Sequence, residues 1–265
     1  MPVRSDFAPG EFCWIDLSAN NLEDAAAWYA DNFGWTHMVM ETPGGGPPYA
    51  FMMSGDGLVA GLGELNEDMK AAGVPPMWNS YIATSDCEAM EAKVKELGGT
   101  VTVPTMEIPG HGKLAFFLDP EGASFAAWQT TNPDSPGLKV SEPVSLCWNE
   151  LMTRDVDKAH EFYGNLADWQ FAEMPMGDVK YSMIKNGGKD AGGMMPMEGP
   201  QFEGVPAHWV VYLTVADCDA AAVKVEATGG KVHVPPMDIP VGRFSMVCDP
   251  QGANFGIIQL AAAPA

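Results

Sequence analysis

The first 65 residues carry an alternating apolar pattern followed by a helical one. Residues 12–18 alternate apolar and polar side chains, which predicts a β-strand, and residues 22–33 place apolar side chains at helical spacing. Asn20 or Asn21 suits the N-cap of this helix, and Gly34 suits its C-terminal stop. Turns rich in Gly and Pro then separate three predicted strands, at residues 35–41, 48–54 and 57–64. This stretch predicts one βαβββ unit.

The same order of elements returns between residues 78 and 129. A strand is predicted at 78–84 and a helix at 86–97, which Gly98 and Gly99 end. Three more short strands follow, near residues 100–106, 112–118 and 124–129. A second βαβββ unit is therefore expected directly after the first.

The second half of the chain repeats the first. Trp14 has its counterpart in Trp148, and the run Asp-Pro-Glu-Gly-Ala at 119–123 is matched by Asp-Pro-Gln-Gly-Ala at 249–253. The sequence therefore predicts an α+β fold of four βαβββ units in two tandem domains. We place the first domain at residues 1–130, a linker rich in Pro, Gly, Asn and Ser at 131–143, and the second domain at 144–265.

The chain is strongly acidic. Its 265 residues include 35 acidic and 14 basic side chains, for a formal net charge of −21, and 46% are hydrophobic. This charge repels phosphate backbones and anionic lipid surfaces, so neither nucleic acid nor a membrane is expected as a partner. No apolar run approaches the roughly 18 residues that span a bilayer, and the first residues lack the apolar core of a secretory signal. A cytoplasmic location is expected.

Five cysteines are widely spaced, and none forms the C-x-x-C pair that is typical of a structural zinc or redox site. We expect buried thiols. Strand alternation predicts that Cys13 and Cys147 face away from Trp14 and Trp148, toward the helices, which would make both thiols poor nucleophiles.

In their order, these motifs resemble those of the vicinal oxygen chelate superfamily, which includes glyoxalase I, extradiol dioxygenases and the bleomycin- and fosfomycin-resistance proteins. The resemblance covers nearly the whole chain and rests on Asn21-Leu22-Glu23, Trp28-Tyr29, Phe33-Gly34-Trp35, Leu97-Gly98-Gly99 and Asp119-Pro120-Glu121-Gly122. It implies two βαβββ units per glyoxalase-like domain, whose curled sheets form a cup around a small ligand. The tandem arrangement is similar to a bacterial two-domain subgroup. Because one duplicated chain can supply the domain pairing that single-domain relatives reach by dimerising, we expect a monomer or a homodimer.

The resemblance also implies a metal site. Metal-dependent members carry His, Gln or Glu at the head of each unit's first strand and Glu near the end of its last strand. The strand-head positions align with Trp14, Asn79, Trp148 and Val210, and the last-strand positions with Gly61, Ala126, Gly192 and Gly256. Since none of these is an ordinary ligand, we expect no metal and no other cofactor. His208, two residues before Val210, leaves a metal-dependent alternative open.

Each half begins with a strand that pairs a tryptophan with a carboxylate. Side chains at i and i+2 share one face of a strand, so we expect Asp16 beside Trp14 and Glu150 beside Trp148. A carboxylate whose pKa is raised by burial can act as a general acid or base, which makes Asp16 and Glu150 the catalytic candidates. In the structural alternative, the carboxylates are solvated or hydrogen-bonded to tyrosines, Tyr81 or Tyr212, while the indoles fill the cups.

Aromatic and polar side chains at matching positions supply the ligand-binding candidates. These are Trp14, Tyr49, Asn79, Tyr81, Trp148, Tyr181, His208 and Tyr212. Eighteen methionines could line an adaptable apolar cavity, although core packing is their commoner role at strand spacing.

Three functions are compatible with this pattern. The first is a metal-independent binding protein that holds a small apolar or aromatic molecule in one or both cups. The second is a metal-independent lyase or isomerase in which Glu150 or Asp16 moves a proton. The third is a metal-dependent glyoxalase or dioxygenase. Because Asn79 in one half is matched by Val210 in the other, one cup could be active and the other degenerate.

Overall fold

The computed structural model describes residues 3–40, 46–132, 135, 137–176 and 179–261. Residue 41 of a predicted strand and residues 133, 134 and 136 of the predicted linker lie outside this range. The first half contains β1 (Phe12–Ala19), α1 (Leu22–Phe33), β2 (Thr36–Met40), β3 (Tyr49–Ser54), β4 (Gly57–Glu64), α2 (Glu67–Ala71), β5 (Met77–Ala83), α3 (Cys87–Glu96), β6 (Thr100–Ile108), β7 (Gly112–Leu118) and β8 (Ser124–Thr130). The second half contains β9 (Leu146–Thr153), α4 (Val156–Ala167), β10 (Gln170–Met176), β11 (Val179–Asn186), β12 (Lys189–Pro196), the 3₁₀-helix η1 (Pro200–Phe202), β13 (His208–Thr214), α5 (Cys218–Ala227), β14 (Lys231–Ile239), β15 (Gly242–Cys248) and β16 (Asn254–Leu260).

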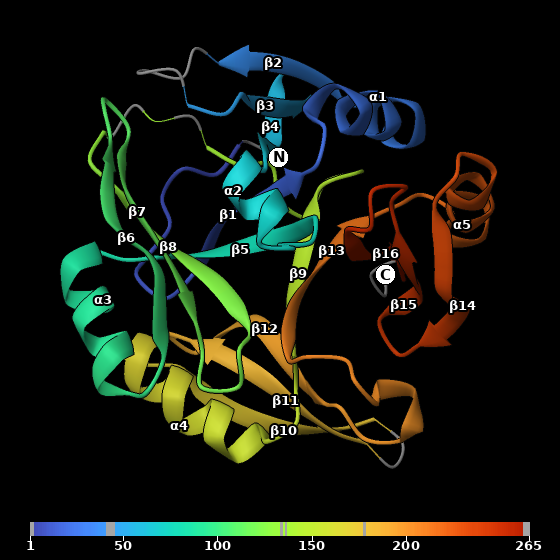
Figure 1. Cartoon of the computed structure of the whole chain (residues 1–265). Coiled ribbons are helices and arrows are strands. Elements are labelled where there is room, and N and C mark those ends of the chain that lie inside the picture. Colours follow the sequence, from blue (N-terminus) through green and yellow to red (C-terminus); the bar gives the residue numbers. More distant parts are fainter. Residues whose placement is uncertain (1–2, 41–45, 133–134, 136, 177–178, 262–265) are drawn as a thin grey trace.

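Each half of the chain forms one eight-stranded sheet, in which two βαβββ units lie edge to edge (Figure 1). The strand order is β2-β3-β4-β1-β5-β8-β7-β6 in the first sheet and β10-β11-β12-β9-β13-β16-β15-β14 in the second. In the first sheet, the first and last strands of each unit pair in parallel, and the units meet through the antiparallel pair β1–β5. The second sheet repeats this pattern, with β9–β13 as the central pair. The predicted α+β fold of four βαβββ units is confirmed.

The first helix begins and ends where the sequence predicts. The side chain of Asn21, its N-cap, accepts the backbone N–H of Asp24 at 2.9 Å. Gly34 ends the helix with a φ of 69°, in the left-handed region that glycine adopts without steric cost. Helix α3 lies one residue inside the predicted range at each end, because Asp86 is its N-cap and Leu97 its C-cap. In the described part of the chain, no helix is long and apolar enough to cross a membrane.

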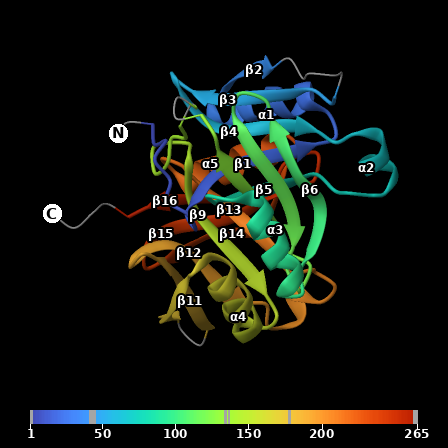
Figure 2. The ribbon, with the colours of Figure 1, turned by 90° about the vertical axis from the view of Figure 1, so that its left-hand side faces the viewer.

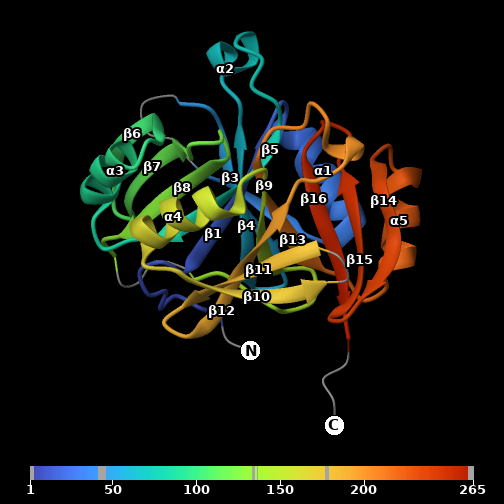
Figure 3. The same ribbon diagram turned by 90° about the horizontal axis from the view of Figure 1, so that it is seen from below.

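The two sheets pack with their helix-bearing faces toward each other, and the apolar cores between them mix residues from both halves. One core joins α1 and β1 to α5 and β16, with Tyr29 1% exposed and Phe255 fully buried. The other joins α3 and β8 to α4 and β12, with Phe125 and Tyr163 fully buried. Figure 3 shows the resulting helix pairs, α1 with α5 and α3 with α4, on opposite sides of the molecule. Each half therefore completes the core of the other.

The Asp-Pro runs that mark each half join the two halves. Asp119 accepts two backbone N–H groups of its own turn and the hydroxyl of Tyr163 in α4, the latter at 3.1 Å. Asp249 closes the matching turn and accepts the hydroxyl of Tyr29 in α1 at 3.2 Å. Burial raises the pKa of both carboxyl groups, against the effect of these hydrogen bonds. The motif therefore links a turn in one half to the leading helix of the other.

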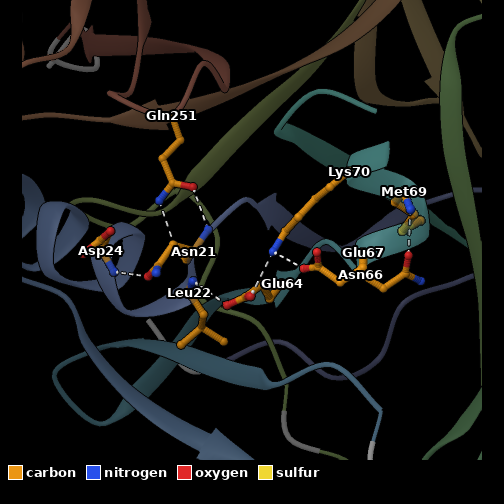
Figure 4. Close-up of polar contacts among 9 residues, drawn as sticks. All are labelled: Asn21, Leu22, Asp24, Glu64, Asn66, Glu67, Met69, Lys70 and Gln251. Carbon is orange, nitrogen blue, oxygen red and sulfur yellow. Dashed lines mark hydrogen bonds and ion pairs between the residues drawn. The ribbon is translucent and has the colours of Figure 1, made fainter. Parts of the chain in front are cut away.

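The start of α1 is held from two sides. The side-chain amide of Gln251 accepts the backbone N–H of Asn21 at 2.9 Å and donates to its carbonyl oxygen at 2.8 Å (Figure 4). Glu64, at the end of β4, accepts the N–H of Leu22 and forms an ion pair with Lys70 of α2 at 3.2 Å. Figures 2 and 3, which are turned by 90° from Figure 1, show that α2 projects away from both sheets.

Candidate functional site

The face of each sheet opposite the helices carries the predicted site residues, and we call these faces cup 1 and cup 2. Cup 1, on the first sheet, is lined by Trp14, Asp16, Ser18, Asn79, Tyr81, Phe116 and Trp128. Cup 2, on the second sheet, is lined at the matching positions by Trp148, Glu150, Met152, Val210, Tyr212, Met246 and Ile258. The structure thus brings together the predicted residues of each half, but in two separate places.

Asp16 is buried in cup 1, with 7% of its surface exposed. Asn79 donates its side-chain N–H to Oδ1 at 2.8 Å, and the Tyr81 hydroxyl donates to Oδ2 at 2.6 Å. Burial raises the pKa of Asp16, and the hydrogen bonds from Tyr81 and Asn79 partly oppose that shift. The contact with Tyr81 is the one that the structural alternative requires, whereas a catalytic role for Asp16 stays a prediction.

Tyr49 of β3 reaches Trp14 of β1 across the strand between them, β4. The indole N–H of Trp14 donates to the Tyr49 hydroxyl at 3.2 Å. The phenol passes over Gly61 of β4, where an added Cβ would lie 1.9 Å from the hydroxyl oxygen. By the resemblance described from the sequence, Gly61 is expected at a position where metal-dependent members carry glutamate. In this chain the tyrosine fills the space that such a glutamate side chain would need.

Cup 2 repeats this frame with a glutamate in place of the aspartate. The Tyr212 hydroxyl donates to Glu150 Oε1 at 2.8 Å. The indole N–H of Trp148 donates to the Tyr181 hydroxyl at 2.8 Å. Burial raises the pKa of Glu150, and the hydrogen bonds from Tyr181 and Tyr212 lower it. Both cups therefore share two contacts: an indole that donates to one phenol, and a carboxylate that accepts from another.

The glycine that faces cup 2 is Gly193, so the predicted assignment to Gly192 is wrong by one residue. Gly193 pairs with Glu150, and a Cβ added there would lie 1.7 Å from the Tyr181 hydroxyl. Gly192 instead faces the interdomain core, where its Cβ would lie 3.2 Å from the ring of Phe12. Tyr49 and Tyr181 are 132 residues apart, and the same spacing leads from Gly61 to Gly193, which pair with Asp16 and Glu150 respectively. The last strand keeps its predicted glycine, Gly256, over which the Tyr212 ring lies.

The prediction that Cys13 and Cys147 face the helices is wrong. The pairing of β1 with β5 shifts register between Phe12 and Trp14, and the pairing of β9 with β13 shifts at the matching place. Each bulge turns the cysteine toward the cup, so Cys13 packs with the cup 1 cluster and Cys147 with that of cup 2. Burial raises the pKa of both thiols, that of Cys147 to about 12, which keeps them protonated and poorly nucleophilic.

The lining of the cups does not fit the metal site of the superfamily. Indoles occupy the heads of β1 and β9, and among the described lining residues each cup has one carboxylate, Asp16 or Glu150, beside mostly aromatic and apolar groups. His208 lies at the start of β13, where its Nδ1 is 2.8 Å from the carbonyl oxygen of Pro206 and burial lowers its pKa. Among the residues that the structure describes, no three His, Cys, Asp or Glu side chains lie close enough to hold one ion.

The connection between the two units of each sheet differs between the cups. In the first half it forms α2, which has no buried residue and is absent from the apolar cluster of cup 1. In the second half it forms η1 and the following turn, whose Phe202 and Val205 pack on the cluster of cup 2. Arg154 donates to the carbonyl oxygens of both, at 2.8 and 2.6 Å. Neither short helix was predicted, and the second covers part of its cup.

The methionines divide between the two roles considered from the sequence. Met52 and Met194 lie in the cores between the sheets, 2% and 0% exposed. Met195 packs in cup 2, and Met38 lies at the rim of cup 1 with 49% exposed.

Three lining residues of cup 1 were not among the predicted candidates: Ser18, Phe116 and Trp128. The sequence does indicate two of them. Ser18 stands two residues after Asp16, and Trp128 stands two residues after Ala126, the expected last-strand position, so each shares a strand face with a predicted position. Phe116 had no such signal, since its place opposite Ala126 depends on the register of the β7–β8 pair, which the apolar pattern does not show.

The fold and both cups define a member of the Glyoxalase/Bleomycin resistance protein/Dioxygenase superfamily, and the chain belongs to it: the family model matches residues 12–126 and 146–257. A protein named "Putative glyoxylase CFP32" from Mycobacterium tuberculosis is 37% identical over 261 residues, 98% of each chain. "Anthracycline biosynthesis protein DnrV" from Streptomyces peucetius is 33% identical over 269 residues, covering 96% of this chain and 94% of the relative.

Solved structures show the same fold at lower identity. The Mn(II)-bound glyoxalase from Novosphingobium aromaticivorans has a TM-score of 0.60 at 16% identity, covering 97% of this chain and 86% of that one. The 2,3-dioxygenase LapB from Pseudomonas sp. KL28 has a TM-score of 0.60 at 14% identity, covering 97% and 95%. At these identities the likeness extends to the fold alone.

Proposed function

We propose that the protein binds a small apolar or aromatic molecule in one or both cups, without a metal ion. The observation that supports this most is the position of the phenols of Tyr49 and Tyr181, which pass over Gly61 and Gly193. A ligating glutamate at either glycine would collide with a phenol that is hydrogen-bonded to a tryptophan. We propose further that the protein works in the cytoplasm as a monomer or homodimer, with neither nucleic acid nor a membrane as partner.

The rings of the cups support an apolar or aromatic ligand. Trp14, Phe116 and Trp128 of cup 1 are half-buried, so part of each ring is open to a ligand that would stack on it or cover it. Burial of apolar area contributes roughly 25 cal/mol per Å². The net charge of −21 disfavours an anionic ligand. A relative whose name places it in anthracycline biosynthesis also points to a polycyclic aromatic molecule.

A second candidate function is proton transfer by Asp16 or Glu150, in a metal-independent lyase or isomerase. Its supporting observation is the short contact of each carboxylate with a phenol, 2.6 Å from Tyr81 and 2.8 Å from Tyr212. Burial raises the pKa of both carboxyl groups toward the range in which an acid also serves as a base. Each phenol has one O–H, which it donates to the carboxylate; after the carboxylate takes up a proton, that O–H would be free to stabilise negative charge on a bound substrate.

The test measures metal content and binding on the same sample. We expect less than about 0.1 equivalent of any transition metal per chain, and equal affinity for 2-naphthol before and after EDTA treatment. A stoichiometric metal whose removal abolishes binding would show the third function, a metal-dependent glyoxalase or dioxygenase. The variants Asp16→Asn and Glu150→Gln separate the binding protein from the metal-independent lyase or isomerase. Loss of turnover with retained binding would show that the protein is an enzyme.

A further inference from the structure

In the side-chain amide of Asn79, the nitrogen donates two hydrogen bonds to described residues and the oxygen accepts none. Its Nδ2 donates to Asp16 Oδ1 at 2.8 Å and to Ser18 Oγ at 3.0 Å, which fixes the orientation of the amide, since a carboxylate and a hydroxyl oxygen accept. Its Oδ1 accepts no hydrogen bond from the described residues, although Asn79 is only 3% exposed. In the described part of the chain, the enclosed side-chain polar atoms without a partner are Thr105 Oγ1 and Ser135 Oγ. The Asn79 oxygen is not among them, so it keeps some accessible surface on the cup 1 side of the sheet, beside Asp16 and Ser18.

Ser18 adds a donor beside this acceptor. Its oxygen accepts from Asn79, and its hydroxyl proton has no acceptor among the described residues. A ligand hydroxyl can donate one hydrogen bond and accept another, so it matches the pair that Asn79 and Ser18 present. A carboxylate or phosphate matches poorly, because Asn79 presents an acceptor and Asp16 lies directly beside it.

Cup 2 lacks this pair. Asn79 is replaced there by Val210, 1% exposed, and Ser18 by Met152, 8% exposed. Phe202 and Val205 also pack over this cup from the connecting segment. A ligand hydroxyl that faced only Val210 and Met152 would lose its hydrogen bonds to water without replacing them, at a cost of about 1–3 kcal/mol.

We infer that cup 1 is the ligand-binding cup and that its ligand is a neutral aromatic molecule with a hydroxyl group, which donates to Asn79 Oδ1 and accepts from Ser18. This inference rests on the proposed function, since it requires a small molecule in the cup. To the proposed function it adds two statements: which of the two cups binds the ligand, and which polar group of the ligand is recognised.

The test compares two probes that differ in one hydrogen-bond donor. The full-length protein is titrated by calorimetry with 2-naphthol and with 2-methoxynaphthalene, which keeps the ring and the acceptor oxygen but has no O–H. We expect one site per chain and a preference for 2-naphthol of roughly threefold to tenfold, the worth of one hydrogen bond. If neither probe binds, the proposed function fails. If both bind equally, only the inference about Asn79 fails.

Matched variants locate the effect. Asn79→Val gives cup 1 the residue that cup 2 carries and should remove the preference, whereas Val210→Asn should leave it unchanged. Ser18→Ala should weaken both probes alike, because both present an oxygen acceptor. Circular dichroism shows whether Asn79→Val folds. If Asn79→Val does not fold, the inference is tested by the preference of the wild-type protein for 2-naphthol and by the affinities of Ser18→Ala. Equal affinities of the wild-type protein for the two probes would overturn the inference.

Discussion

The two cups share a frame and differ in their lining. In both, a tryptophan on the first strand donates to a tyrosine two strands away, a glycine makes room for that tyrosine, and a buried carboxylate accepts from a second tyrosine. The lining differs at four matched pairs: Ser18 and Met152, Asn79 and Val210, Phe116 and Met246, Trp128 and Ile258. At these four pairs cup 1 has Ser18 and Asn79 beside the rings of Phe116 and Trp128, whereas the matched side chains of cup 2 are all apolar.

The largest effect is expected from filling the glycine under each tyrosine. Gly61→Ala places a methyl group 1.9 Å from the Tyr49 hydroxyl, and Gly193→Ala places one 1.7 Å from that of Tyr181. Both should lower the free energy of unfolding by about 1–3 kcal/mol, because the phenol must move in a packed site. Only Gly61→Ala should weaken 2-naphthol binding, by more than tenfold. Urea denaturation and calorimetry measure the two effects, and equal losses of affinity would show that the cups do not differ.

A smaller effect is expected from releasing the segment that covers cup 2. Arg154→Ala removes the two hydrogen bonds to the carbonyl oxygens of Phe202 and Val205. We expect a loss of about 1 kcal/mol in stability, since the guanidinium is exposed. Amide hydrogen exchange at residues 201–205 should accelerate, with no change in 2-naphthol affinity. Unchanged exchange would mean that Phe202 and Val205 hold this segment without Arg154.

The two buried carboxylates give a pH dependence of the same sign in both cups. Burial raises the pKa of Asp16 and Glu150 in the folded protein, so the unfolded chain releases these protons first as the pH rises. Each group therefore costs stability increasingly above its unfolded pKa of about 4, up to its folded pKa. The stability of Asp16→Asn and Glu150→Gln relative to wild type should rise between pH 4 and pH 7. Urea denaturation at several pH values measures this, and a relative stability that falls over the window would contradict the assigned direction.

The smallest effect is expected at α2. Lys70 pairs with Glu64 and Glu67 at the surface, 3.2 Å from each, and such exposed pairs contribute little. Lys70→Ala should leave both the melting temperature and 2-naphthol affinity unchanged, in contrast to Arg154→Ala. A clear loss of affinity would show that α2 acts as a cover for cup 1.

The four units and the helix ends of the first half could be predicted because their signals are local. Asn21 acts through its side chain on the next turn and Gly34 through its own backbone, and the main motifs recur in the second half. The partner of each buried face could not be predicted. The spacing of Tyr29 indicates that it is buried, but its hydrogen bond to Asp249, 220 residues away, depends on how the two sheets pack.

The site was predicted as far as strand alternation holds. Asp16 and Trp14 share a face as expected, and so do Glu150 and Trp148. Cys13 and Cys147 were misplaced because a bulge adds one residue to each strand, and a bulge changes the face without a mark in the apolar pattern. The cover of cup 2 was missed because three residues of 3₁₀-helix leave too short a pattern.

The difference between the cups is tested most directly by labelling the methionine methyl groups and following them by NMR as 2-naphthol is added. Met38 and Met106 lie at the rim of cup 1, paired with Phe51 and Leu114, while Met152, Met195 and Met246 line cup 2. Each signal is assigned by a Met→Leu substitution. We predict that the methyl signals of Met38 and Met106 shift with the ligand and that the three in cup 2 do not. Shifts confined to the cup 2 methyls would contradict the account.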